Sequence, residues 1–290
     1  MTSLPTTRGL ALAYRISLLV GALTTAVSVV SVFDPARVYP GLEPALLPLF
    51  VGQDALNVIV ALPALVGSMW LARRGALIGL LLWPGALFYV VYDFGYYALG
   101  APFNAFFVPY LLLITLSGYA LVGVVASIDA PAVRAQLRAS VPARVVGGFL
   151  VGLAALFTLL WTGMSIAALA SGETLPLVPR IVTTLDLTIE LPALFVGGLL
   201  LLRRQPLGYI VAAGLLLQAG AYLAGLSVIT VLTQVLTHAP FEALAVVPGI
   251  VVGVISFALI GPFIHGAAHV RPAQAPTPTL TGPTPDMRGA

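Results

Sequence analysis

Two acidic residues lie inside one long apolar stretch of the chain. Glu190 is about ten residues past Arg180, which is ~15 Å along a helix, close to the midplane of a membrane. Asp186 precedes Glu190 by one helical turn, so the two carboxyls share a face. A carboxylate in the middle of a membrane helix costs roughly 2.5–3.5 kcal/mol and is a functional hypothesis by default. This pair predicts a site for a substrate or ion, and the alternative is a protonated or hydrogen-bonded packing residue.

Two other apolar stretches carry acids beside polar or aromatic residues. Asp93 follows Tyr89 by four residues, and Asn57 follows Asp54 by three, so each pair shares a helix face. Asp93 among tyrosines predicts a polar, hydrogen-bonded pocket, although aromatic residues also form belts at membrane interfaces. Asp54 is a further site candidate, with N-capping or interaction with the helix dipole as the alternative.

The composition explains why acids in helices are notable. Of 290 residues, 60% are hydrophobic and 8% charged, whereas soluble domains carry about 25% charged residues. We therefore predict an all-α polytopic membrane protein in contact with the lipid bilayer. Absence of cysteine excludes thiol catalysis and Cys-ligated metals. No nucleotide-binding, dinucleotide-binding or metalloprotease motif occurs, so no cofactor is expected.

Eight stretches are long enough to cross a ~30 Å hydrocarbon core. They are 10–33, 50–72, 76–99, 105–127, 145–170, 181–202, 207–235 and 243–267. With both termini inside, eleven arginines lie on the inner side and two on the outer side. This positive-inside bias predicts a prokaryotic inner (cytoplasmic) membrane protein with cytoplasmic termini. The same distribution explains the basic residues without nucleic-acid binding.

Similar residues recur 129 positions apart, which predicts an internal duplication. Pro63 and Pro192 stand at this offset in similar strings, and Gly79 and Gly208 repeat it. The Arg-Arg pairs depart from it by one residue, which indicates a small insertion or deletion. We expect two tandem four-helix repeats, parallel because each has an even number of spans. The expected division is 1–128 for the first repeat, 129–143 for a cytoplasmic linker, 144–269 for the second repeat and 270–290 for a disordered tail.

The offset also relates polar residues of the two repeats. Asn57 corresponds to Asp186, Tyr89 to Gln218, and Asp93 to Tyr222. The complete set of candidate site residues is therefore Glu190, Asp186, Asp93, Asp54, Asn57, Tyr89, Tyr222 and Gln218.

Two glycine pairs have the spacing of close helix contacts. Gly148 and Gly152 form one GxxxG pattern, and Gly249 and Gly253 form the other. Packing inside the bundle is favoured, and a homo-oligomer interface is the alternative.

Several short motifs of the first repeat carry a resemblance. They are Gln53-Asp54, Leu62-Pro63, Arg74-Gly75, Leu82-Trp83, Tyr89, Tyr92, Phe103-Asn104 and Tyr110. With these motifs the chain resembles uncharacterised multi-pass membrane proteins of prokaryotes. The resemblance implies a membrane location and carries no activity.

Three functions fit these patterns. The first is a transporter or channel coupled to a small cation or proton, with an acidic cavity open to the outside. The second is a non-catalytic membrane subunit or sensor, whose buried polar residues hold helices together. The third and least favoured is an intramembrane enzyme that uses paired carboxylates.

Overall fold

The computed structural model describes residues 4–238 and 240–268, and eight long apolar helices dominate it. The helices that can span a membrane by length and composition are α1 (Ala11–Phe33), Leu47–Arg73, α5 (Leu77–Gly100), α6 (Phe107–Ser127), α8 (Ala143–Ser171), Leu177–Leu202, α11 (Pro206–Leu236) and α12 (Ala243–Ala268). The described residues form no strand beyond an isolated bridge between Thr6 and Ile128. The predictions of an all-α membrane protein and of eight spans are confirmed.

Two short helices connect the long ones. The helix α2 (Pro35–Val38) follows α1, and α7 (Ala130–Leu137) lies between α6 and α8. Val133 and Leu137 are the buried residues of α7, which packs against α11 and α12. The expected tail 270–290 lies outside the described residues, as does the last residue of the second repeat.

The second and sixth spans are each interrupted in the same way. The second consists of α3 (Leu47–Leu56), the π-helical turn η1 (Asn57–Ala61) and α4 (Leu62–Arg73). The sixth consists of α9 (Leu177–Leu185), the π-helical turn η2 (Asp186–Glu190) and α10 (Leu191–Leu202). A proline follows each turn after one residue, and its missing N–H removes a helical hydrogen bond. Each turn opens with a polar residue, Asn57 or Asp186, whose carbonyl accepts an N–H from five residues on.

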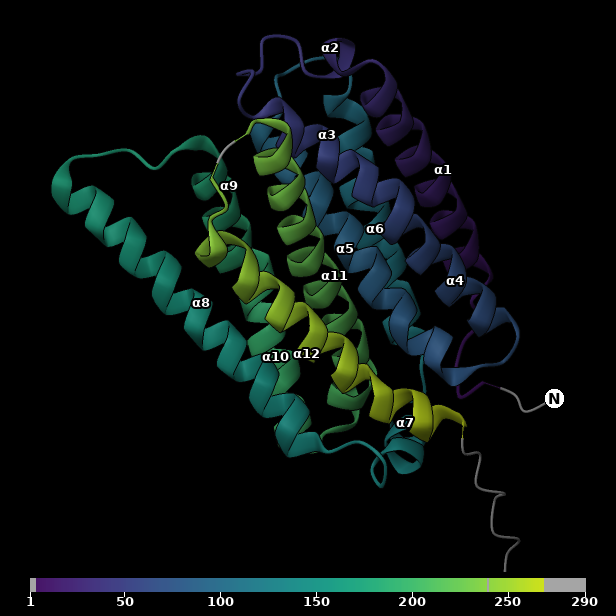
Figure 1. Cartoon of the computed structure of the whole chain (residues 1–290). Helices are drawn as coiled ribbons and strands as arrows, with labels where there is room; N and C mark the ends of the chain where they lie inside the picture. Colours follow the sequence, from purple (N-terminus) through teal and green to yellow (C-terminus); the bar gives the residue numbers. More distant parts are fainter. Residues whose placement is uncertain (1–3, 239, 269–290) are drawn as a thin grey trace, which may run out of the picture.

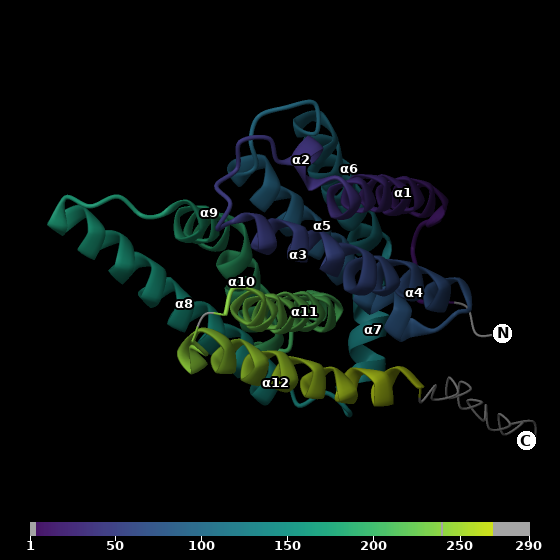
Figure 2. The same cartoon turned by 45° about the horizontal axis from the view of Figure 1, so that its top comes forward.

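The helices α5 and α11 form the centre of the bundle, with the others around them (Figures 1 and 2). They cross at Gly85 and Gly214, which are 129 residues apart. A Cβ atom on Gly85 would lie 2.2 Å from the carbonyl oxygen of Gly214. Only glycine allows the two backbones to approach this closely.

The turns before α5 and before α11 also match at the offset of 129. Gly75 and Arg204 both have positive φ, 82° and 53°. A Cβ atom on Gly79 would lie 2.5 Å from the backbone nitrogen of Ala72. A Cβ atom on Gly208 would lie 2.4 Å from the backbone nitrogen of Leu201. The offset therefore holds on both sides of the turn, and the structure needs no insertion or deletion there. The duplication itself stays a prediction, which these recurrences support.

The two halves differ in how their first helix packs. In the first half α1 packs against α6, whereas in the second half α8 packs chiefly against α10. The C-terminal part of α8 stands apart from the bundle (Figure 1), and Leu159 on it is 75% exposed.

The two GxxxG patterns have different surroundings. Gly249 and Gly253 lie against α11, where Ser227 and Ala224 are their nearest neighbours. Packing inside the bundle is therefore confirmed for this pair. Cβ atoms on Gly148 and Gly152 would meet nothing within 4 Å, so the packing prediction is wrong for the pair on α8.

Candidate functional site

Four carboxyl groups are buried inside the helix bundle. Asp54 comes from α3, Asp93 from α5, and Asp186 and Glu190 are the first and last residues of η2. All four are less than 9% exposed, and Asp54 and Asp93 are completely buried. The acids predicted to lie inside the spans therefore form a polar interior that the helices enclose.

Asp93 is held by two side-chain amides from the neighbouring span. Gln53 donates from Nε2 to Oδ1 of Asp93 over 2.7 Å, and Asn57 donates from Nδ2 to Oδ2 over 2.6 Å. Gln53 and Asn57 are one helical turn apart, so both reach the same carboxyl. The Nε2 of Gln53 also lies 3.2 Å from the hydroxyl of Tyr89. Both oxygens of Asp93 are thus satisfied within the protein.

Asp54 accepts two hydroxyl groups from the first span and the loop after it. Ser31 and Tyr39 both donate to its Oδ2, while its Oδ1 has no partner among the described residues. Burial, and next the charge of Asp54, raise the pKa of Tyr39 above the usual tyrosine value, so the phenol stays protonated and donates. Asp54 lies seven residues after the start of α3, so the alternative of N-capping is wrong.

Replacing Tyr39 with phenylalanine removes one of these two donors. We expect the variant to lose about 1–3 kcal/mol of unfolding free energy, because a buried carboxyl loses a hydrogen bond. Denaturant unfolding of the purified protein measures this loss. The control Tyr119→Phe, at a residue that is 71% exposed, should change the free energy little. Equal effects of the two substitutions would contradict the role of Tyr39.

Asp186 is bound by one aromatic donor from each half. The hydroxyl of Tyr92 on α5 donates to its Oδ1, and the indole Nε1 of Trp161 on α8 donates to its Oδ2, both over 2.6 Å. The carboxyl of Asp186 therefore connects α5 of the first half with α8 of the second half.

Glu190 has fewer partners than the other acids. It is close enough to Asp186 for their charges to interact, and Gln218 on α11 lies beside its carboxyl. The Oε2 of Glu190 and the Oε1 of Gln218 both lack a hydrogen-bond partner among the described residues, as does the hydroxyl of Thr183. Three acceptor atoms in this region are therefore unused.

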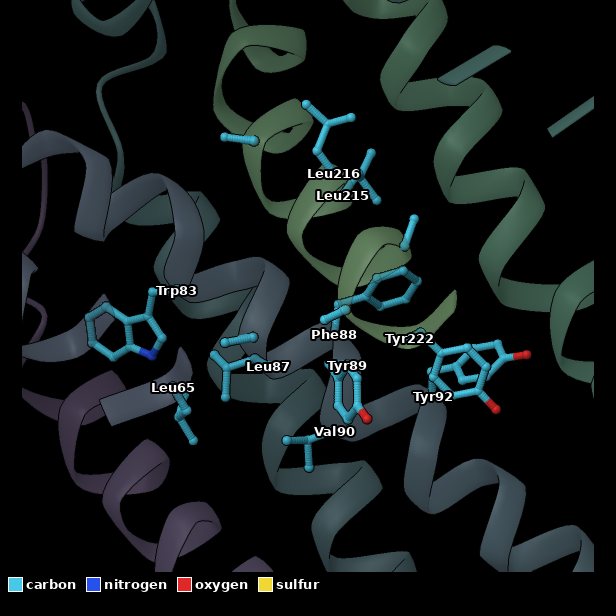
Figure 3. Close-up of a cluster of buried hydrophobic side chains, with 14 of the residues drawn as sticks. Leu65, Trp83, Leu87, Phe88, Tyr89, Val90, Tyr92, Leu215, Leu216 and Tyr222 are labelled. Carbon is cyan, nitrogen blue, oxygen red and sulfur yellow. The ribbon is translucent and has the colours of Figure 1, made fainter. Parts of the chain in front are cut away.

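Tyrosine rings join the two groups of acids. The ring of Tyr222 lies with its centroid 4.6 Å from Tyr92 and 6.0 Å from Tyr89. Figure 3 shows these three rings together at the contact of α5 with α11. The structure thus brings the predicted site residues into two connected groups: Asp54, Asn57, Tyr89 and Asp93 in the first, and Asp186, Glu190, Gln218 and Tyr222 in the second.

The carboxyls have no positively charged neighbour in the described part of the chain. Their hydrogen-bond partners are amides, hydroxyls and one indole. Within the same residues, no group of three or more histidines and acids could hold a metal ion. An uncompensated buried charge is costly, so these carboxyls either carry a proton or require a bound cation.

The four carboxyls, expected to line an acidic cavity open to the outside, are all buried among the described residues. Tyr39, Phe50 and Tyr97 pack around Asp54. The two most prominent pockets of the described residues are lined by apolar side chains and one threonine, and by none of the four acids. Aromatic packing therefore encloses Asp54, which was expected to face water.

Sequence reasoning did not select Ser31, Tyr39 or Trp161. Tyr39 lies in the segment between two spans, and Trp161 lies in a helix with no acid. No spacing along the chain links them to Asp54 or Asp186, because the contacts form only when the helices pack.

Comparison with known proteins gives no match: no family model, no curated protein and no solved structure is similar to this chain. The case for function therefore depends on the geometry of the site.

Proposed function

We propose that this chain is a transporter of the inner membrane that couples the movement of a cation to that of a proton. The observation that carries the proposal is Glu190, a carboxyl 6% exposed in the middle of a span, which within the described residues has an unused oxygen and no positive neighbour. Asp186 on the same turn is the second acid of the site.

The coupling follows from charge. A buried carboxyl can be neutral with a proton, or ionised with a cation beside it. A proton and a cation therefore compete for the same group. If the site faces one side of the membrane and then the other, this competition exchanges one for the other.

The position of the site at the contact between halves suits such a change. The chain Tyr89, Tyr222, Tyr92 connects the acids across α5 and α11. A rocking motion of two parallel repeats about the crossing at Gly85 and Gly214 would change the contacts of Tyr222. The arginine distribution supports cytoplasmic termini, with the acids toward the outer half.

Proteoliposomes that contain a pH-sensitive dye test the proposal. Vesicles loaded with sodium, potassium or benzyltrimethylammonium are diluted into buffer without that cation. We expect at least one outward gradient to drive protons into vesicles with wild-type protein, and Glu190→Gln to reduce the rate to that of empty vesicles.

The control for this experiment is Glu173→Gln, the same substitution at an exposed loop residue. It should transport at the wild-type rate. Equal proton movement in wild-type, Glu190→Gln and empty vesicles for every cation would contradict the proposal.

The second candidate is a non-catalytic subunit or sensor. The amide pair that satisfies Asp93 favours it, because such a group holds helices together without a ligand. In this alternative, Glu190→Gln changes the stability of the protein and does not change its response to any ion.

A further inference from the structure

A pocket of about 580 Å³ lies between α8 and the sixth span. Its lining is Ala154, Ala155, Thr158, Leu159, Leu187, Leu191, Pro192, Phe195 and Val196. Thr158 is the one polar member. Several lining residues, including Leu159, are exposed on the surface of the bundle, so the pocket is accessible from that surface.

The pocket adjoins the acids of the second half. Leu187 and Leu191 line it, and each directly follows one of the acids Asp186 and Glu190 in the chain. Trp161 lies one helical turn after Thr158 on α8, and its indole donates to Asp186. The indole of Trp161 therefore connects the wall of the pocket with the carboxyl of Asp186.

At one matched position the second half has an acceptor where the first half has a donor. By the offset of 129, Asn57 corresponds to Asp186. In the first half, Asn57 and Gln53 supply N–H groups to Asp93. In the second half, Glu190 Oε2 and Gln218 Oε1 have no hydrogen-bond partner among the described residues, and Gln218 is 1% exposed. A ligand that bears N–H groups and a positive charge could donate to these two oxygens.

The aromatic residues nearby suit the same ligand. Tyr92 and Trp161 donate to Asp186, and the ring of Tyr222 lies with its centroid 4.6 Å from that of Tyr92. Aromatic faces attract organic cations. An inorganic ion would leave the adjoining apolar pocket unused.

We propose that the second half binds an amphipathic organic amine, with its ammonium group at Glu190, Asp186 and Gln218 and its apolar part in the pocket beside α8. The ammonium donates to the unused oxygens and neutralises one carboxylate, while the other carboxyl keeps its proton. The apolar part reaches the pocket from the lipid. This inference rests on the proposed function and names its substrate class.

Thermal unfolding of the purified protein in detergent tests the inference, since a ligand that binds the native state raises its stability. The probes are phenethylammonium, its uncharged analogue phenethyl alcohol, sodium chloride and a lowered pH. We expect phenethylammonium to raise the Tm of wild-type protein more than any other probe. Glu190→Gln should weaken its apparent affinity at least about tenfold, while Glu173→Gln should bind as wild type does.

A second variant, Thr158→Phe, fills the pocket without touching a carboxyl. Thr158 is exposed, so the variant should fold. We expect its affinity for phenethylammonium to fall about tenfold, with its responses to sodium and pH unchanged.

Four results would overturn the inference. Equal shifts with phenethylammonium and phenethyl alcohol, or wild-type affinity in Thr158→Phe, would contradict an amphipathic amine. Responses to sodium or pH that depend on Glu190, without one to the amine, would overturn the inference and leave the proposed function standing. No response that depends on Glu190 with any probe would contradict both.

Discussion

Replacing Gly85 with valine is expected to prevent the chain from accumulating as a folded, monodisperse protein. The Cβ of any residue at this position would lie 2.2 Å from the carbonyl oxygen of Gly214 and 2.4 Å from its Cα. The obstruction is backbone, so no side chain can move away, and α5 must separate from α11. Overpacking of a core usually costs about 1–3 kcal/mol, and we expect a loss at or above the upper end.

Size-exclusion chromatography and thermal unfolding in detergent measure this effect. The matched control is Gly118→Val on α6, where an added Cβ meets nothing within 4 Å. It should behave as the wild type does. A Gly85→Val protein with unchanged Tm would show that α5 and α11 do not cross at these glycines.

Replacing Asn57 with leucine is expected to give the second largest loss of stability. The substitution removes the 2.6 Å hydrogen bond to Asp93 Oδ2 and leaves that oxygen buried without a donor. Removing one partner of a buried polar pair costs about 1–3 kcal/mol, and more when the group left behind is charged. We expect a loss of about 3 kcal/mol of unfolding free energy.

A double variant separates this hydrogen bond from a general packing defect. Adding Asp93→Leu to Asn57→Leu removes both polar groups, so the double variant should be more stable than the single one. Gln205→Leu, at an exposed residue, serves as the control for the substitution itself. A double variant that instead loses as much unfolding free energy as the Asn57→Leu and Asp93→Leu variants lose together would contradict the prediction. That result would show that the two side chains act independently.

The membrane helices could be predicted from the sequence because a helix that crosses a lipid bilayer must have a minimum length and an apolar composition. The break at Gly100 is an example, since α5 ends at that residue. Pro63 and Pro192 follow the interruptions of the second and sixth spans. A proline weakens a helix at its position but does not specify a π-helical turn, whose form depends on the packing of the residues around it.

The site was predictable in its acids and less so in their partners. Asp186 and Glu190 were selected because carboxyls are costly in a membrane, and this reasoning needs no tertiary structure. Trp161 and Tyr39 reach the acids only through the packing of α8 and the loop after α1. Gly85 and Gly214 carried no distinguishing signal among 29 glycines. The degree of enclosure was also unpredictable, because it depends on how aromatic rings pack around Asp54.

Infrared difference spectroscopy tests most directly whether Glu190 exchanges a proton for a cation. Spectra of the purified protein are recorded with and without phenethylammonium, and with sodium as a second cation. We expect cation binding to remove the C=O band of a protonated carboxylic acid in wild-type and Glu173→Gln protein, and to leave the Glu190→Gln spectrum unchanged. The same difference spectrum in Glu190→Gln as in the wild type would contradict the assignment of the exchanging group.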